Sequence, residues 1–324
     1  MQVLVAGGAG YIGSVTAAEL LAAGHRVIVY DSLISGHAAA VSGEAELVAG
    51  DVRDQELLAR VFADHRIDAV VYYGGFIVAG ESMSEPGRYF ANNIGGIICL
   101  LNTMLENDVR RFVFSSSAAV YGQPQAVPIP EDAPINPVNP YGESKAVVER
   151  LLRWYDGQCG LRHISLRYFN AAGATATLGE DHRPETHLIP IVLQVALGQR
   201  EAVPIYGTDY PTPDGTCIRD YIHVFDLARA HVLALDRLKE GSAVYNLGNG
   251  QGFSNLQVIE AARRVSGQAI PAQEEARRPG DPPSLVASAE KARRELGWQP
   301  QFPVLEEIIE SAWHWHREHP NGYG

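Results

Sequence analysis

Short apolar runs alternate with helix-like segments along the first half of the chain. The runs are apolar almost without interruption, which is typical of strands covered on both faces and therefore of a parallel sheet. Strand–helix repetition of this kind predicts an α/β fold built on a Rossmann-type, doubly wound parallel sheet. The predicted strands are Gln2–Ala6, Arg26–Tyr30, Ala45–Ala49, Ala69–Tyr73, Arg111–Ser115 and His163–Arg167. The predicted helices are Tyr11–Ala23, Asp54–His65, Arg88–Asn107 and Tyr141–Gln158.

The texture of the sequence changes after Asn170. The stretches Gly173–Arg183 and Tyr206–Gly215 are rich in Gly, Pro, Thr and Asp, which indicates loops. We predict a nucleotide-binding domain over residues 1–170 and a smaller α/β substrate domain over most of residues 171–324, with residues 224–247 returning to the first domain. The remaining predicted elements are the helix Val224–Leu238, the strand Ala243–Leu247 and the helices Asn255–Val265 and Val304–His316.

Composition and charge narrow the class of protein. Of the 324 residues, 46% are apolar and 20% are charged, and the net charge is −12. An acidic chain lacks the positive field that non-specific binding to nucleic acid or to anionic lipid requires. The N-terminus has no basic residue before Arg26, and no apolar run approaches the ~20 residues that span a bilayer. The three cysteines are far apart in the sequence. We therefore expect a soluble cytoplasmic protein with no nucleic-acid or membrane partner.

A glycine-rich turn follows the first predicted strand. Gly7, Gly10 and Gly13 open the first predicted helix, so backbone N–H groups and the helix N-terminus can approach a pyrophosphate closely. Asp31 ends the second strand, where its carboxylate can accept a ribose hydroxyl and repel a 2′-phosphate, which favours NAD over NADP. A tight turn with Asp31 as a helix cap is the structural alternative. Asp51-Val52 can contact adenine, or Asp51 can simply cap the next helix.

Tyr141 and Lys145 are spaced so that they share one face of a predicted helix. A Lys charge about 5 Å away, at an effective dielectric of about 20, lowers the pKa of a phenol by roughly two units. The phenol could then exchange a proton with a sugar hydroxyl. Ser117 ends the fifth strand, at the sheet edge where ligands bind in such folds. The alternative for Tyr141 and Lys145 is a surface pair.

Longer motifs resemble the UDP-glucose 4-epimerase family, which belongs to the extended short-chain dehydrogenases/reductases. The resemblance covers essentially the whole chain. The motifs are Gly7–Gly13, Ser115–Gly122, Asn139–Gly142, Leu166–Asn170, Asp181–Pro190, Asp214–Val224, Arg277–Asp281 and His314–Tyr323.

The resemblance implies reversible epimerisation at carbon 4 of UDP-hexoses, through a transient 4-keto sugar and a tightly bound NAD. It also implies a homodimer formed through Arg88–Asn107 and Tyr141–Gln158. The catalytic residues implied are Tyr141, Lys145 and Ser117. The cofactor-binding residues implied are Gly7, Gly10, Tyr11, Ile12, Gly13, Asp31, Ser32, Asp51, Val52, Tyr73, Gly74, Gly75, Asn93, Ser115, Tyr141, Lys145 and Tyr168. The substrate-binding residues implied are Ser117, Tyr141, Asn170, His187, Leu188, Arg219, Tyr221, Arg278, Asp281 and Leu285.

By this resemblance, Arg219 and Arg278 hold the diphosphate, unless they are simply exposed loop charges in ion pairs. Leu285 corresponds to the position beside the sugar, and its intermediate size does not decide whether UDP-N-acetylhexosamine is a substrate. A UDP-uronate is a further alternative substrate. The proton passes from the sugar to Tyr141 directly or through Ser117.

The sequence departs from the family at the expected cofactor cradle. The fourth strand ends Tyr72-Tyr73-Gly74-Gly75, where the family has His-Phe-Ala-Ala or a close variant, and Ala6 and Ser32 replace Thr and Asn. Added glycines cost about 0.5–1 kcal/mol each where φ is negative. We therefore expect that NAD is held more loosely, or that the pocket is reshaped.

Two other classes are less well supported. A nucleotide-sugar dehydratase needs an acidic pair beside the serine, and Ala118-Ala119 stand there instead. A non-catalytic NAD sensor predicts the loss of Tyr141 or Lys145, and both are present. His314 and His316 do not face each other on a helix, so we predict no metal and a solvated C-terminal helix.

Overall fold

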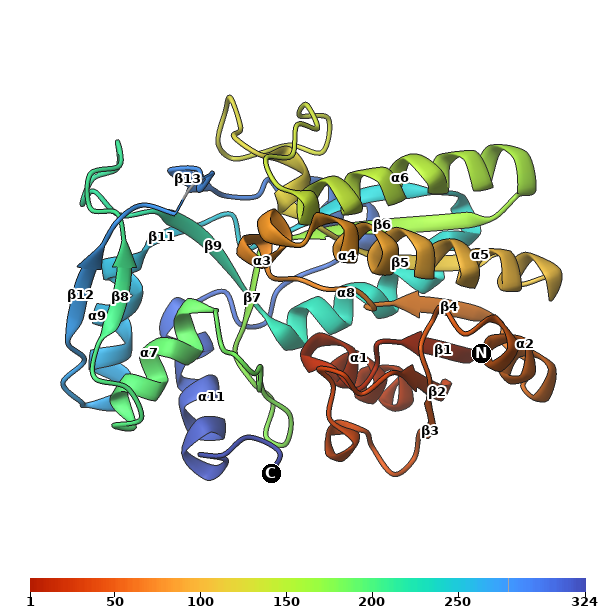
Figure 1. Ribbon diagram of the computed structural model, residues 1–324, viewed down its shortest axis with the longest axis horizontal. Helices are drawn as coiled ribbons and strands as arrows, with labels where there is room; N and C mark the ends of the chain where they lie inside the picture. The colour runs from red at the N-terminus through yellow and green to blue at the C-terminus, as the bar shows by residue number, and fades with distance from the viewer. Residues whose placement is uncertain (279) are drawn as a thin grey trace.

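A seven-stranded parallel sheet organises most of the molecule (Figure 1). The structure is a computed structural model that describes residues 1–278 and 280–324. The strands are ordered β10-β6-β5-β4-β1-β2-β3, and every neighbouring pair is parallel. This is the predicted Rossmann-type fold, in which ligands bind at the carboxyl ends of the strands. The strands are β1 (Gln2–Ala6), β2 (Arg26–Asp31), β3 (Glu46–Ala49), β4 (Ala69–Tyr72), β5 (Arg111–Ser117), β6 (Arg162–Tyr168) and β10 (Ala243–Leu247).

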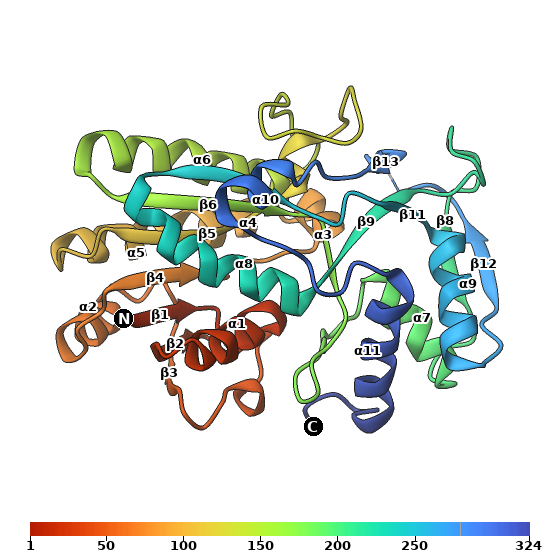
Figure 2. The same ribbon diagram turned by 180° about the vertical axis from the view of Figure 1, so that it is seen from behind.

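Helices cover both faces of this sheet (Figures 1 and 2). Alternate residues of β1 divide between two cores, with Val3 and Val5 in one and Leu4 and Ala6 in the other. The first core includes α1 (Tyr11–Ala22) and α8 (Val224–Arg237), and the second includes α2 (Gln55–Asp64), α5 (Gly96–Glu106) and α6 (Pro140–Cys159). None of the helices in the described part of the chain combines the length and apolar character needed to cross a bilayer.

The helix predicted over Arg88–Asn107 is divided. It consists of α4 (Pro86–Phe90), a π-helical turn over Ala91–Gly95, and α5, with the short α3 (Ala79–Ser84) before it. Asn and Gly residues in the π-helical turn are poor helix formers. A Cβ on Gly96 would lie 2.6 Å from Val52 Cγ2, so the helix passes close to the segment that follows β3.

The second part of the molecule is built around β9 (Ile218–His223). β9 pairs with three short strands that come from distant parts of the sequence: β7 (Asn170–Ala172), β11 (Gly252–Ser254) and β13 (Ser284–Leu285). A two-stranded sheet joins β8 (Val203–Tyr206) and β12 (Ala272–Glu275). The helices of this part are α7 (Leu188–Ala196), α9 (Asn255–Ser266) and α11 (Leu305–Glu318), whereas α10 (Glu290–Leu296) packs on β10 and α8 of the large sheet. The expectation of a solvated α11 is wrong, because α11 packs on α9 and α7 and buries Trp315 and His316.

Candidate active site

The backbone is packed closely in the glycine-rich turn between β1 and α1. Gly7 has φ +80°, and a Cβ there would lie 2.7 Å from Gly74 N. A Cβ on Gly13 would lie 2.2 Å from Gly7 O, so Gly13 lets α1 pack against the turn. Gly10 is the N-cap of α1, and no side chain in the described part of the chain caps it. The first turn of α1, with Tyr11 and Ile12, therefore fits the pyrophosphate of a dinucleotide.

Two carboxylates at strand ends shape the nucleotide side of this cradle. Asp31 is buried, and its oxygens accept backbone N–H groups from Ala9 (2.9 Å) and Leu33 (2.8 Å), which fixes the turn. Ser32 beside it is exposed. Asp51 is held by Arg53, whose hydrogen bond keeps the pKa of Asp51 below its usual value.

The alternative in which Asp51 caps α2 is wrong. The N-cap of α2 is Asp54, whose carboxylate accepts the Leu57 N–H at 3.0 Å. Val52 lies against the position of Gly96 on α5, so the Asp51-Val52 segment is packed between β3 and that helix.

The residues Tyr72–Gly75, which depart from the family pattern, fit one another sterically. A Cβ on Gly74 would lie 3.0 Å from the ring of Tyr72, so the small residue makes room for the large one. Gly75 has φ +141° and faces the Asn93 side chain, so glycine suits this backbone. The expected backbone cost of glycine therefore does not apply at Gly75. Tyr73 donates or accepts a 2.6 Å hydrogen bond with Thr16 Oγ1.

Asn93 joins this segment to the catalytic helix. Its Oδ1 accepts the Phe76 N–H at 2.8 Å, while its Nδ2 donates to the Phe76 carbonyl at 3.0 Å and to Ser144 Oγ at 3.1 Å. Ser144 lies between Tyr141 and Lys145 on α6. The segment after β4 and α6 are therefore held in one network.

Tyr141, Lys145 and Ser117 meet at the carboxyl edge of the sheet. Asn139 caps α6 by accepting the Gly142 N–H at 2.8 Å, which starts the helix directly before Tyr141. Lys145 is buried and donates from Nζ to the Ser115 carbonyl at 2.8 Å. Its Nζ lies 5.9 Å from the centre of the Tyr141 ring. The surface-pair alternative is wrong for Lys145, because its ammonium is buried.

The expected depression of the Tyr141 pKa is wrong. Burial raises the pKa of Tyr141 above its ordinary value, although the neighbouring Ser117 hydroxyl lowers it in part. Burial also lowers the pKa of Lys145 to about 8. The ammonium is directed to the Ser115 carbonyl instead of the phenol, so removal from water outweighs its attraction for the phenolate. Tyr168 ends β6, where it pairs with Ser117 on β5.

Strand pairing gathers the residues expected on the substrate side. Asn170 on β7 pairs with Tyr221 on β9, and Leu285 on β13 pairs with Arg219 on the other side of β9. Arg219 is mostly buried, donates to the Pro282 carbonyl at 3.0 Å and lies 3.6 Å from Asp281.

In the described part of the chain, no contact joins Arg278 to Arg219. It is exposed, and its guanidinium lies 3.9 Å from the centre of the Tyr206 ring. Pro279, in the same motif, lies outside the described residues.

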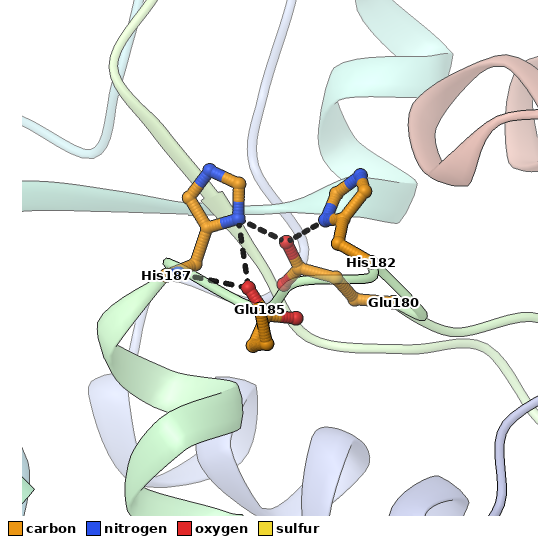
Figure 3. A group of neighbouring side chains, drawn as sticks. All are labelled: Glu180, His182, Glu185 and His187. Atoms are coloured by element: carbon orange, nitrogen blue, oxygen red, sulfur yellow. Dashed lines mark hydrogen bonds and ion pairs between the residues drawn. The ribbon is translucent and has the colours of Figure 1, made fainter. Parts of the chain in front are cut away.

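His187 and Leu188 begin α7, and His187 belongs to a group that the sequence analysis missed. Its Nδ1 lies 2.7 Å from Glu180 Oε1 and 3.3 Å from Glu185 Oε1, while His182 approaches the same Glu180 oxygen (Figure 3). Burial alone would lower the pKa of His187, but the two carboxylates raise it to about 10. The regular spacing Glu-x-His-x-x-Glu-x-His was present in the sequence as a signal.

The fold and this site define an NAD-dependent enzyme of the short-chain dehydrogenase type. The sequence profile described as "NAD dependent epimerase/dehydratase family" matches residues 3–248. That range contains the glycine-rich turn, Ser117, Tyr141 and Lys145. The class of protein is therefore given independently by the residues and by the family profile.

Known relatives narrow the class further. UDP-glucose 4-epimerase of Halalkalibacterium halodurans is 54% identical, and that of Lacticaseibacillus casei is 52% identical; each match covers 100% of this chain and 98% or 99% of the relative. The crystal structure of UDP-glucose 4-epimerase from Bifidobacterium longum in complex with NAD⁺ and UDP superposes with a TM-score of 0.96 at 40% identity, over 99% of this chain and 100% of that one. The chain belongs to the UDP-glucose 4-epimerase family.

Proposed function

We propose that this protein interconverts UDP-galactose and UDP-glucose by epimerisation at carbon 4 of the sugar, with a retained NAD. The observation that carries this proposal is the Tyr141 phenol, which lies beside the Ser117 hydroxyl and close to the Lys145 ammonium, at the sheet edge next to the glycine-rich turn. When bound, NAD supplies the acceptor and donor of the hydride at carbon 4. The first part of the chain, residues 1–170 with 224–247, is proposed as its binding domain.

The residues of the chain then handle protons and position. Tyr141 accepts the proton of the sugar 4-hydroxyl and returns it after the keto sugar has turned in the site. Ser117 orients the phenol and favours its phenolate, and Lys145 supplies a positive charge nearby. Burial makes these interactions stronger than they would be in water, because the local dielectric is low.

The second part of the chain, mainly residues 171–324, is proposed to bind the nucleotide-sugar. Arg219 is held in place by two carbonyls and by Asp281, and its backbone pairs with that of Leu285 on β13. A guanidinium fixed in this way suits a diphosphate. We propose that Arg278 joins it there, because its exposed side chain is free of such backbone bonds in the described part of the chain.

Product analysis of the purified protein tests the function. Incubation with UDP-galactose is expected to give UDP-glucose, with parallel reactions containing UDP-N-acetylgalactosamine and UDP-galacturonate. Tyr141→Phe should lower kcat by about 10³-fold, since the proton acceptor is removed. Tyr155→Phe, on the outer part of the same helix, is the control and should keep normal turnover. Equilibration of the acetylated or acidic pair alone would replace the proposed substrate, and an active Tyr141→Phe variant would refute the catalytic assignment.

We also propose that the segment Tyr72–Gly75, with Ala6 and Ser32, reshapes the NAD cradle. The missing Cβ of Gly74 leaves room for the large ring of Tyr72. The Tyr73 ring lies 4.8 Å from the ring of His231. Measuring the NAD content of the purified protein tests this. One tightly retained NAD per chain together with full UDP-galactose turnover would show that the cradle works as in other members.

A homodimer through α5 and α6 is proposed next. The two helices lie side by side, joined by a 2.8 Å hydrogen bond from Tyr155 to Asn102, and Trp154 on α6 is 69% exposed (Figure 1). Trp154→Glu should shift the mass measured by sedimentation from dimer to monomer. Val304→Glu, at another exposed apolar side chain, is the control. A wild-type monomer would refute the proposal.

A reducing, cytoplasmic location is proposed from the thiols. Cys99, Cys159 and Cys217 are all free. Free thiols are typical of proteins in reducing compartments. Fractionation of the source cells tests this, and recovery of the protein outside the cytoplasm would contradict it.

A further inference from the structure

The loop between β7 and α7 brings four metal-ligand side chains together within eight residues. Glu180, His182, Glu185 and His187 each direct one oxygen or nitrogen toward a common point, and these four atoms lie within 4.8 Å of one another (Figure 3). Three of the separations between these ligand atoms, each joining an imidazole nitrogen to a carboxylate oxygen, are 2.7, 3.1 and 3.3 Å. Donors about 2.0–2.1 Å from a tetrahedral zinc ion are about 3.4 Å apart. The shortest of these separations is about 0.7 Å below that value and the longest separation in the group is no more than 4.8 Å, so side-chain movements of about 1 Å would bring the four atoms around an ion.

One nitrogen in this group lacks a properly oriented partner. His187 Nδ1 is buried and makes no hydrogen bond of good geometry in the described part of the chain, although two carboxylates are close to it. The side chains of Glu180 and Glu185 are only 5% and 3% exposed. Both carboxylates therefore face a nitrogen that is hydrogen-bonded to neither of them, and an ion bound between them would provide a partner for all three groups.

The surroundings hold the ligands and give access to them. Glu185 Oε1 accepts the backbone N–H groups of Thr186 (2.7 Å) and His187 (2.8 Å), which fixes its orientation. A cavity of about 280 Å³ borders Glu180, His182 and Glu185, so an ion can reach the site from one side.

We propose that Glu180, His182, Glu185 and His187 bind one divalent transition-metal ion, with zinc as the best match. Two imidazole nitrogens and two carboxylate oxygens are suited to Zn²⁺, whereas Ca²⁺ and Mg²⁺ prefer oxygen ligands alone. Four protein ligands complete a tetrahedral shell and leave no position for a reacting molecule. The ion is therefore structural and takes no part in the epimerisation.

The location gives the ion a mechanical role. His182 lies edge-on to the ring of Tyr11, with 6.4 Å between ring centres, and Tyr11 donates to the Gly173 carbonyl at 2.6 Å. Tyr11 stands in the first turn of α1, beside the glycine turn, while His187 is the N-cap of α7. The ion would therefore fix the loop between α7 and the nucleotide side of the molecule.

Metal titration of the full, NAD-loaded chain without an affinity tag tests the proposal. The protein is treated with a chelator, dialysed and titrated with Zn²⁺ against a chromophoric competitor, and the bound metal is counted by elemental analysis. One Zn²⁺ per chain and a rise in melting temperature are expected. Co²⁺ should give the visible absorption of a four-coordinate ion. Failure to bind Zn²⁺, or equal preference for Ca²⁺ or Mg²⁺, would overturn the proposal.

Matched variants locate the ion. His182→Gln and Glu180→Gln should each weaken Zn²⁺ binding by at least about 100-fold and abolish the rise in melting temperature. His314→Gln removes an exposed histidine from α11 and should bind as the wild type does. Unchanged binding in folded His182→Gln or Glu180→Gln would place the ion elsewhere and refute the site. If both variants fail to fold, the metal count and the Co²⁺ spectrum of the wild type decide.

Discussion

Two neighbouring loops in this molecule are built in opposite ways. The turn Gly7–Gly13 requires glycine, because its backbone atoms approach each other so closely that Cβ atoms would collide. The loop Gly179–His187 depends on side chains that are present, since two buried carboxylates and two partly exposed imidazoles lie in one group. Tyr11 and His182 bring the loops into contact. The first loop, at the start of α1, offers backbone N–H groups to an anion. The second loop offers carboxylate oxygens and imidazole nitrogens as ligands to a cation.

This difference explains which loop could be interpreted from sequence. Glycine spacing after a strand has one structural consequence, which the local chain fixes. The Glu and His residues of the second loop acquire their meaning only when the loop folds over α1 and α11 and excludes water from them. Their regular spacing becomes informative once their burial is known.

The largest effect is expected from adding one methyl group to the first loop. Gly13→Ala places a Cβ 2.2 Å from Gly7 O, and backbone atoms cannot move aside cheaply. We expect a loss of about 3 kcal/mol in the free energy of unfolding, measured with urea, together with loss of NAD. Gly10→Ala is the matched control. Its Cβ meets Gly7 O at 3.5 Å and no other atom of the described residues within 4 Å, so it should fold with less than about 1 kcal/mol lost but retain NAD poorly. Equal stability of the two variants would contradict the comparison.

Removing one charge from the second loop should have the next largest effect. Glu180→Gln leaves His187 with one carboxylate in place of two. Breaking a buried ion pair costs about 3–5 kcal/mol, and because the His187 side chain is 39% exposed we expect about 2 kcal/mol. Urea unfolding in the presence of a chelator measures this without a metal contribution. Glu310→Gln, an exposed change on α11, is the control. A loss below about 0.5 kcal/mol would show that the charges do not hold the loop.

The fold could be predicted as far as local patterns determine it. β1 and β10 have the predicted bounds, and the other sheet strands and α1, α2, α6 and α8 differ at their ends by a few residues. β7, β11 and β13 were missed because each has only two or three residues and forms by pairing with β9, far away in sequence.

The site was predictable in its residue types but not in its electrostatics. Tyr141 and Lys145 meet as the helical spacing requires. Their pKa values could not be foreseen, because these depend on how completely the folded chain removes both groups from water and on the Ser115 carbonyl that takes the Lys145 ammonium. The buried face of α11 was missed for the same reason: Trp315 and His316 are covered by parts of the chain that are remote in sequence.

A third prediction contrasts buried histidines with and without carboxylate partners. Burial lowers the pKa values of His163, His223 and His231 to about 4, whereas His187 is held protonated by its two carboxylates. The unfolded chain binds protons at these three histidines near pH 6.5, before the folded chain does. Stability is therefore present above pH 6.5 and is lost as pH falls toward 4, by about 1–2 kcal/mol per histidine at pH 5.

Urea unfolding between pH 7 and pH 5 measures this loss. His163→Gln should make the pH dependence less steep by about one third, because one of three titrating groups is gone. A pH dependence that is unchanged in this variant would show that His163 does not titrate in the way its burial implies.

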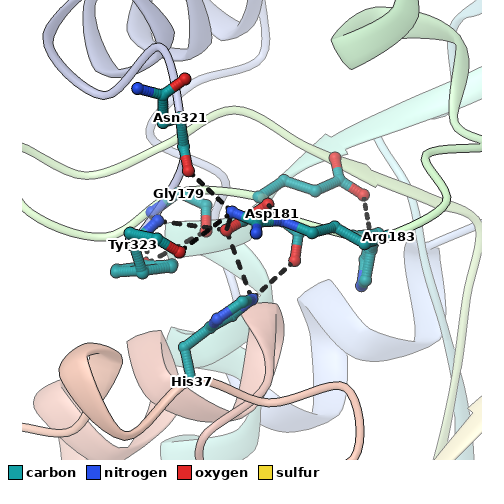
Figure 4. Close-up of polar contacts among 9 residues, drawn as sticks. His37, Gly179, Asp181, Arg183, Asn321 and Tyr323 are labelled. Atoms are coloured by element: carbon teal, nitrogen blue, oxygen red, sulfur yellow. Dashed lines mark hydrogen bonds and ion pairs between the residues drawn. The ribbon is translucent and has the colours of Figure 1, made fainter.

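The smallest effect is expected on the other side of the second loop. Asp181, next to Glu180 in the sequence, holds the C-terminal segment: its Oδ2 accepts the Tyr323 N–H at 3.1 Å, and Arg183 and His37 approach it within 3.4 Å (Figure 4). Asp181→Asn keeps an oxygen for Tyr323 and loses only partly exposed ion pairs, so we expect about 0.5–1 kcal/mol.

Hydrogen exchange of the last residues should detect this change before unfolding does. Faster exchange is expected at Tyr323, with unchanged protection in α7, because the Glu/His group on the opposite side of the loop is intact. If hydrogen exchange in α7 also became faster in Asp181→Asn, the contacts of Asp181 and the Glu/His group would open as one cooperative unit. That result would contradict the expectation that the two parts of the loop act independently.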